Sequence, residues 1–209
     1  LIKLVDKVVR QSEGTNELRK YLVGKFAQQF EFTPSPEWDG VYSHIVQQYV
    51  EGEASTWDAS TLQKVKEVSE IKMKLAIGVS FPNLLLTNPA GIEQPLESVK
   101  SDYTVLFFYD PGCTHCRETT PKLTALAQQF ADKMKVYAVS LDAEEKPWKS
   151  FIEEFKTENF VNVRDITRKV EFYKLGVFNY PTIYLLDREK KIVARWLNVE
   201  QLSTYLLNR

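Results

Sequence analysis

The stretch that most constrains the fold of this chain is the run YTVLFFYD at residues 103–110. It is apolar almost without interruption, which is typical of a β-strand buried on both faces of a sheet. A strand of that kind has to be covered by other layers of secondary structure. The run therefore predicts a layered domain in which this strand is buried between the layers.

The sequence after Gly78 alternates between strand and helix patterns, as such a domain requires. We expect a hairpin in NLLLTNPAGIEQPL, strands in YTVLFFYD and KVYAVSLD, and a terminal strand pair in TIYLLDREKKIVARWL. Helices are expected from about Cys113 to Lys133, around Trp148 to Phe155, around Arg168 to Lys174, and in VEQLSTYLL. The alternation predicts an α/β domain over residues 78–209.

Residues 1–77 have a different pattern and predict a small all-helical domain. Apolar side chains recur there at helical spacing in four segments. We expect them to form its core: Leu1, Leu4, Val5, Val8, Val9; Leu18, Tyr21, Leu22, Phe26, Phe30; Val41, Ile45, Tyr49, Val50; Leu62, Val65, Val68, Ile71.

Composition excludes several classes of partner. The chain has 209 residues, 44% of them hydrophobic, which is enough for a sizeable core in a soluble protein. Lys and Arg number 27 against 28 Asp and Glu, so no bulk charge attracts nucleic acid or an anionic membrane. No apolar run approaches the roughly 20 residues that span a bilayer, and the first residues do not resemble a signal peptide.

Both cysteines lie in the stretch FFYDPGCTHCRETTPKL, as Cys113 and Cys116. A structural zinc site needs four ligands, and beyond this pair and His115 the chain offers only His44, so we expect no metal. A structural disulfide across so short a loop would add little stability. A redox pair is the better interpretation, with Cys113 as the exposed attacking thiol at a helix start and Cys116 as the buried resolving thiol. Such a couple requires no cofactor.

Two stretches resemble thioredoxin-like proteins. FFYDPGCTHCRETTPKL is similar to their strand, C-x-x-C pair and first helix, including Pro121, and YKLGVFNYPTIYLLDREKKIV is similar to the segment around their cis-proline. The insertion LDAEEKPWKSFIEEFKTENFVNVRD and the hairpin before the central strand resemble the bacterial TlpA and ResA type. The resemblance implies an α/β thioredoxin-like fold with an N-terminal hairpin and a central helix-strand insertion over residues 78–209. The preceding helices resemble a domain found in some envelope oxidoreductases.

The resemblance also implies roles for particular residues. A cis bond before Pro181 would place the backbone of Tyr180 beside Cys113, where a substrate strand binds. Gly112 and Thr114 flank Cys113 and are further candidates for substrate contact. His115 next to the thiolate would stabilise the reduced form and make the couple more oxidising than that of thioredoxin.

The sequence departs from the family at several positions. Gly112 replaces a common Trp, so an aromatic lid over the pair would come from Tyr109 or be missing, and Phe107 replaces the buried Asp of thioredoxin. The carboxylate of ResA-type proteins aligns with Ala143, so the candidates for proton transfer from Cys116 are Glu144, Asp142 and water.

The expected activity is thiol-disulfide exchange, in which the dithiol reduces protein disulfides and an upstream electron donor restores it. The resemblance implies the periplasm or cell envelope of a bacterium. Two alternatives use the same residues: a redox-sensing adaptor, and a peroxiredoxin-like peroxidase. The peroxidase is disfavoured because Asp110 stands where that family needs a Thr.

Overall fold

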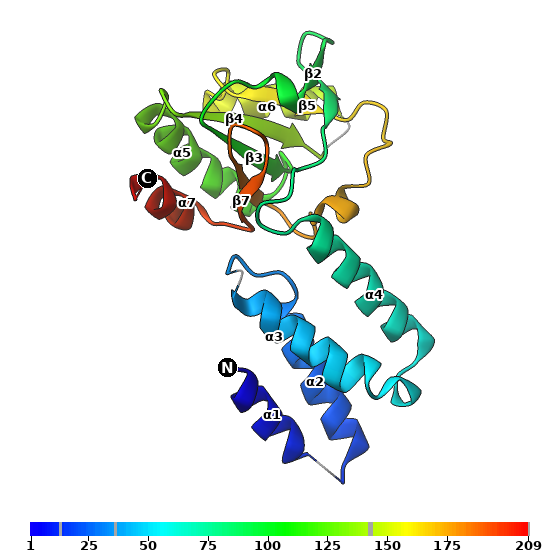
Figure 1. Cartoon of the computed structure of the whole chain (residues 1–209). Helices are drawn as coiled ribbons and strands as arrows, with labels where there is room; N and C mark the ends of the chain where they lie inside the picture. The colour runs from blue at the N-terminus through cyan, green and yellow to red at the C-terminus, as the bar shows by residue number, and fades with distance from the viewer. Residues whose placement is uncertain (13, 36, 142–143, 209) are drawn as a thin grey trace. The chain divides into compact units, whose positions relative to one another are not determined.

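The computed structural model describes residues 1–12, 14–35, 37–141 and 144–208 (Figure 1). Its contacts divide the chain into two compact units, Leu1–Lys74 and Leu75–Arg209. The change in sequence pattern placed a boundary between residues 77 and 78. Leu75 belongs to the second unit because its side chain is fully buried and its carbonyl accepts a hydrogen bond of 2.6 Å from Arg195.

The first unit is all-helical, as the sequence predicts. Its helices are α1 (Ile2–Arg10), α2 (Asn16–Glu31), α3 (Glu37–Ile45), which continues as a π-helical segment (Val46–Glu51), a 3₁₀ turn (Ala54–Thr56) and α4 (Ala59–Lys74). Their buried side chains form one cluster: Val5, Val9, Val23, Phe30, Val41, Tyr42, Ile45, Val46, Tyr49, Val50 and Val68.

Part of the predicted helical core is exposed instead. Leu1 and Leu4 are each 58% exposed, Leu18 is 47% exposed and Tyr21 is 60% exposed. Helix α2 buries Val23, which lies outside the predicted stripe. The prediction was wrong here because each short helix buries only a narrow line of side chains, and spacing alone does not say which line.

The second unit contains a seven-stranded sheet with the order β2-β1-β5-β4-β3-β6-β7. The hairpin predicted before the central strand is β1 and β2, and the terminal pair is β6 and β7. The strands are β1 (Leu85–Thr87), β2 (Glu93–Pro95), β3 (Tyr103–Tyr109), β4 (Met134–Ser140), β5 (Val161–Arg164), β6 (Thr182–Leu186) and β7 (Ile192–Arg195), with a 3₁₀ turn at Leu96–Ser98.

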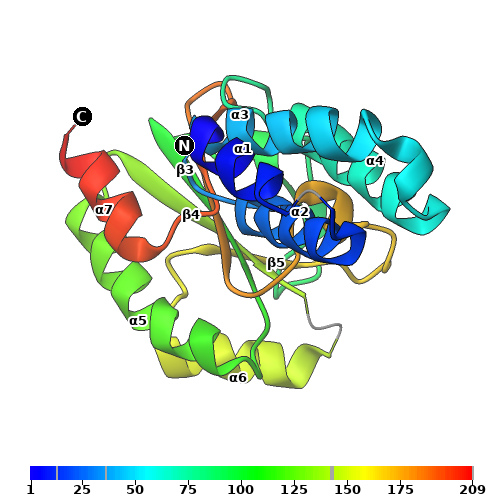
Figure 2. The same ribbon diagram turned by 90° about the horizontal axis from the view of Figure 1, so that it is seen from below.

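Strand β3 lies inside this sheet, between β4 and β6, and is buried as its apolar run predicts. It pairs in parallel with β4, which pairs in parallel with β5, and it pairs antiparallel with β6. One face of the sheet packs against α5 (Thr114–Gln129), α6 (Glu145–Phe155) and α7 (Val199–Leu207), which lie along the same side in Figure 2. On the other face, Phe108 contacts the rings of Phe81, Phe172 and Tyr184. Helix α6 and strand β5 form the predicted helix-strand insertion.

The helix predicted around Arg168 to Lys174 is absent from the described structure. Only Phe172–Leu175 forms a 3₁₀ turn, and Arg168 has a left-handed φ of 54°. The buried Asp165 accounts for the difference. Its carboxylate accepts hydrogen bonds from the backbone N–H groups of Thr167 (2.9 Å) and Val170 (2.8 Å). These bonds stabilise a loop in place of a helix.

Candidate active site: the Cys113 and Cys116 dithiol

The turn between β3 and α5 positions the two cysteines. One carboxylate oxygen of Asp110 accepts the N–H of Gly112 at 2.7 Å, and the carbonyl of Asp110 accepts the N–H of Cys113 at 3.1 Å. Asp, Pro and Gly in succession favour such a turn, because the Asp side chain binds the backbone two residues on. Cys113 is therefore the N-cap residue of α5.

The two sulfurs lie in different environments. Both cysteines are free thiols, with Cys113 half-buried and Cys116 fully buried. The backbone N–H of Cys116 donates to Sγ of Cys113 at 3.4 Å, as expected for a thiol that caps a helix start. Burial raises the pKa of the Cys116 thiol, and the backbone N–H of Asp110, which faces that sulfur, opposes the rise. At neutral pH Cys116 is therefore protonated.

The segment before β6 lies against Cys113, although it is far away in sequence. The Tyr180-Pro181 peptide bond is cis, which confirms the expectation from the resemblance. The Sγ atom of Cys113 is 3.7 Å from the carbonyl oxygen of Tyr180. Tyr180 is 44% exposed, so the carbonyl beside the thiol belongs to an exposed residue.

The other candidates in the C-x-x-C stretch are exposed. Gly112 and Thr114 face solvent on either side of Cys113. The side chain of His115 is 79% exposed, and its Nδ1 is 3.4 Å from a carboxylate oxygen of Glu118. Among the described residues, Glu118 is the hydrogen-bond partner of the His115 imidazole. His115 therefore points toward Glu118 and not toward the thiols.

Tyr109 is not an aromatic lid over the dithiol. It is 1% exposed and stacks on Phe107 at 5.1 Å and on Phe151 of α6 at 4.6 Å between ring centroids. Burial raises the pKa of the Tyr109 phenol, and the Trp148 indole opposes the rise. Tyr109 therefore belongs to the core behind Cys116, because it points to the face of β3 that α5 and α6 cover.

The candidate proton relay is only partly described. Glu144 is exposed and immediately precedes α6. Asp142 lies outside the described residues. Sequence reasoning noted Asp110 as a departure from peroxiredoxins and missed that it builds the turn before Cys113. The signal was present, since Asp-Pro-Gly directly before the first cysteine is a turn sequence.

His44, the other histidine, has a structural partner. Its Nε2 lies 2.7 Å from a carboxylate oxygen of Asp6, and the hydroxyl of Tyr49 donates to that oxygen at 2.5 Å. Burial and this bond raise the pKa of Tyr49 to about 12. The described parts of the chain contain no group of three or more His, Cys, Asp or Glu side chains suited to a metal ion.

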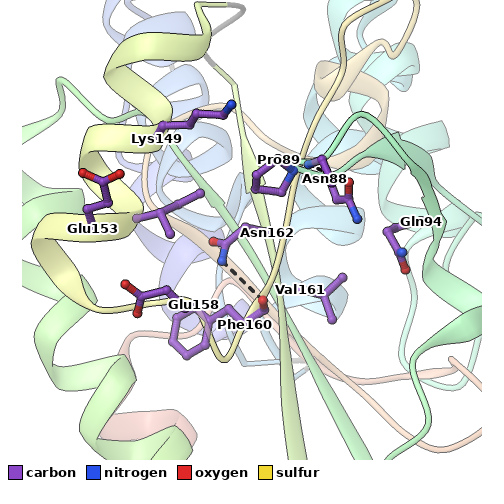
Figure 3. Close-up of a pocket in the computed structure, with 11 residues that line it drawn as sticks. Asn88, Pro89, Gln94, Lys149, Glu153, Glu158, Phe160, Val161 and Asn162 are labelled. Atoms are coloured by element: carbon purple, nitrogen blue, oxygen red, sulfur yellow. Dashed lines mark hydrogen bonds between the residues drawn. The ribbon is translucent and has the colours of Figure 1, made fainter.

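A separate cavity of about 650 Å³ lies between the β1–β2 turn, α6 and β5 (Figure 3). Its wall combines apolar groups such as Pro89 and Phe160 with the charged groups of Lys149, Glu153 and Glu158. None of its lining residues belongs to the C-x-x-C stretch or to the Tyr180-Pro181 segment. The dithiol therefore lies outside this cavity.

In the residues described, no helix has the length and apolar character needed to cross a membrane.

A thioredoxin-like sheet with a dithiol at the start of the helix after its central strand, and a cis-proline segment against the first thiol, defines a thiol-disulfide oxidoreductase. The chain belongs to the AhpC/TSA family, whose profile matches residues 77–195.

Relatives of known name or structure agree with this assignment. The thiol-disulfide oxidoreductase ResA of Bacillus cereus is 27% identical over 65% of this chain and 79% of its own length. A solved domain of a possible thiol-disulfide isomerase from Cytophaga hutchinsonii is 33% identical, with a TM-score of 0.61 over 64% of this chain and 92% of that domain. A thioredoxin-like protein from Bacteroides caccae has a TM-score of 0.78 over 100% of this chain and 76% of its own, at 20% identity, which shows a shared fold.

Proposed function

We propose that this thiol-disulfide oxidoreductase reduces disulfide bonds of other proteins in the bacterial cell envelope, in the periplasm. The observation that carries the proposal is the approach of Cys113 Sγ to the Tyr180 carbonyl, 3.7 Å away. A half-buried thiol at a helix start, beside an accessible backbone carbonyl, suits attack on a disulfide held in an extended segment. The resemblance to the ResA type supports the compartment.

The reaction proceeds in two exchanges. The thiolate of Cys113 attacks one sulfur of the substrate disulfide, and the other substrate sulfur leaves as a thiolate. Cys116 then loses its proton and attacks Cys113, which closes the internal disulfide and releases the second substrate thiolate. Two electrons pass to the substrate, and an upstream dithiol donor returns them by the reverse exchange.

Residues around Cys113 have proposed roles in substrate contact. The Tyr180 carbonyl accepts a hydrogen bond from the substrate backbone, and Pro181 shapes the segment that presents it. Gly112 and Thr114 are exposed beside the thiol. Gly112 carries no side chain, so it leaves room for a bulky substrate protein.

Trapping tests this function. With Cys116→Ser, the first exchange should proceed and the second should not, so mixed disulfides on Cys113 should accumulate in the cell envelope and be identified by mass spectrometry. The matched control is Cys113→Ser, which keeps one thiol but should trap nothing. Equal trapping by both variants, or none by Cys116→Ser, would contradict the proposal.

Trapping tests the adaptor alternative, and a peroxide assay tests the peroxidase alternative. A redox-sensing adaptor should hold one partner in a stable complex that changes on oxidation, whereas a reductase should trap several partners. A peroxidase should consume hydrogen peroxide in proportion to Cys113 turnover. Asp110 disfavours the peroxidase, because one of its carboxylate oxygens is bound to the Gly112 N–H.

A further inference from the structure

The sheet is only partly covered along the outer edge of β5. Strand β1 pairs with β5 at a single position, Thr87 with Arg164, so Val161 and Asn162 at the start of β5 have no partner among the residues of β1. On its inner side β5 pairs with β4 along its whole length. A strand edge without a neighbour leaves backbone N–H and C=O groups that can pair with another chain.

The turn between β1 and β2 does not cover this edge, because its polar groups bond to one another. The backbone N–H of Asn88 donates to the carbonyl of Ile92 at 2.9 Å, and the Asn88 carbonyl accepts the N–H of Gly91 at 2.9 Å. The side-chain oxygen of Asn88 accepts the N–H groups of Ala90 (3.0 Å) and Ile92 (2.9 Å). The cavity of about 650 Å³ shown in Figure 3 lies between this closed turn and β5.

One buried polar group in the wall of this cavity lacks a partner. Asn162 is 5% exposed, and its Nδ2 donates to the carbonyls of Thr157 (2.6 Å) and Phe160 (3.3 Å). These two bonds fix the orientation of the amide, and Figure 3 shows its oxygen turned away from the Phe160 carbonyl. Within the described parts of the chain, that oxygen accepts no hydrogen bond. Since buried acceptors are nearly always bonded, it marks a place for a hydrogen-bond donor.

The charges around the cavity indicate which kind of donor fits. Lys149 forms an ion pair with Glu145 at 2.6 Å, which offsets its positive charge. The carboxylates of Glu153 and Glu158 also line the cavity, and neither forms an ion pair with a described residue. The wall therefore combines apolar groups with an excess of negative charge. A lysine or arginine side chain suits such a wall, because its apolar stem ends in a cationic donor.

We propose that this cavity binds an extended segment of a partner protein that carries a lysine or arginine. The backbone of the segment pairs with Val161 and Asn162 as one more short strand, and the cavity receives its basic side chain. The cation lies near Glu153 and Glu158. Strand β4 separates β5 from β3, so the partner is held at a place distinct from the dithiol. The inference goes beyond the proposed function, because binding here involves no thiol.

Binding of synthetic peptides to the full chain tests the proposal. The probe is a capped peptide of seven residues, in which threonine and valine alternate around one central lysine. One control peptide has glutamate in place of the lysine, and another has N-methyl groups on the backbone amides on one edge, which cannot donate to β5. Each control peptide should bind at least about tenfold more weakly than the probe, because it lacks either the cation or the backbone donors.

NMR spectra of the ¹⁵N-labelled protein locate the bound peptide and give its affinity. We expect the lysine peptide to shift the backbone amides of Val161 and Asn162 and the side-chain amide of Asn162. The backbone amides of Cys113 and Cys116 should not shift. Shifts confined to the two cysteines, or no binding at millimolar peptide, would overturn the site.

Removal of the two carboxylates tests the charge. The double variant Glu153→Gln, Glu158→Gln should weaken binding of the lysine peptide by about fivefold or more at low salt, since it removes both unpaired negative charges. Glu154→Gln is the matched control, because Glu154 follows Glu153 in α6 but pairs with Arg117 and does not line the cavity. It should leave the affinity within about twofold.

Several results would contradict the proposal. Equal affinities of the double variant and the unchanged protein would remove the charge from recognition, and equal affinities of the lysine and N-methylated peptides would exclude pairing with β5. Lysine amide that binds as tightly as the peptide would show that the site takes a small amine. Self-association that shifts the Val161 and Asn162 amides would show that a second copy of the chain occupies the edge. Either occupant would overturn the assignment to a partner protein.

Discussion

At the residue scale, the turn before α5 gives two chemically similar thiols opposite properties. Cys113 caps the helix and is partly open to solvent, whereas Cys116, one turn later, points into the core of the second unit. Desolvation raises the pKa of Cys116 because burial disfavours its charged form. The first exchange can therefore begin from solvent, while the second occurs inside the protein.

Alkylation should distinguish these thiols directly. At pH 7 the reduced protein should react with iodoacetamide at Cys113 at least about tenfold faster than at Cys116, because only the exposed thiolate reacts rapidly. Peptide mass spectrometry at successive times measures both rates. In denaturant the two rates should converge, which controls for intrinsic differences. Preference for Cys116 in the folded protein would show that the assignment is reversed.

His115 provides a second prediction at this scale. The sequence led us to expect that His115→Ala would make the couple more reducing by about 30 mV, the equivalent of one pKa unit of thiolate stabilisation. The structure directs the imidazole to Glu118 and into solvent, so screening should reduce the shift to less than that. Redox titration against glutathione measures it. A fall of 30 mV or more would show that the imidazole acts on the thiolate in solution.

At the scale of secondary-structure elements, the loop before the cis-proline segment is organised by one side chain. Asp165 is 8% exposed and bonds the N–H groups of Thr167 and Val170 as well as the Thr167 hydroxyl, at 2.6 Å. The loop forms despite the helical pattern of the sequence, because the Asp165 carboxylate bonds the backbone N–H groups that a helix would otherwise pair. The loop leads to Tyr180, so Asp165 contributes to the site indirectly.

Asp165→Ala should destabilise the second unit by about 1–3 kcal/mol, since it removes three hydrogen bonds to a buried carboxylate. Hydrogen exchange of the sheet amides in increasing urea measures the loss. Asp132→Ala, on an exposed carboxylate after α5, should change the stability by less than about 0.5 kcal/mol. Similar values for the two variants would mean that the Asp165 bonds do not hold the loop.

At the scale of the whole molecule, the residues proposed to carry the chemistry lie in one of the two units. The dithiol and the Tyr180-Pro181 segment both belong to Leu75–Arg209. The solved domain from Cytophaga hutchinsonii matches 64% of this chain, so a relative of about this size folds without an equivalent of the helical unit.

A truncated protein that begins at Leu75 should therefore fold and reduce an aromatic disulfide within about twofold of the full chain. A second truncation that begins at Gly78 lacks the buried Leu75 and its bond to Arg195, and should be less stable by about 2 kcal/mol or more. Thermal unfolding measures the stability of both truncated proteins, and release of thiolate from the aromatic disulfide measures their activity. A folded but inactive protein beginning at Leu75 would show that residues 1–74 complete the site.

The sequence by itself determined the features that depend on near neighbours. Periodicity predicted the hairpin, the central strand and the terminal α7, because alternation and turn residues act within a few positions. The spacing of Cys113 and Cys116 predicted a redox pair because the two residues are also near neighbours, one helical turn apart. The features that the sequence left open depend on contacts between residues far apart in the chain.

Only the tertiary structure decided which side of each element is buried. It placed Tyr109 in the core and His115 in solvent, and it left two of the five residues of the first helical stripe, Leu1 and Leu4, exposed. It also showed the Tyr180 carbonyl beside Cys113, which only the family resemblance had implied, and showed that the Asp110 side chain holds the turn before α5. These outcomes follow from the packing of segments far apart in the chain, and local sequence patterns carry no information about which segments meet.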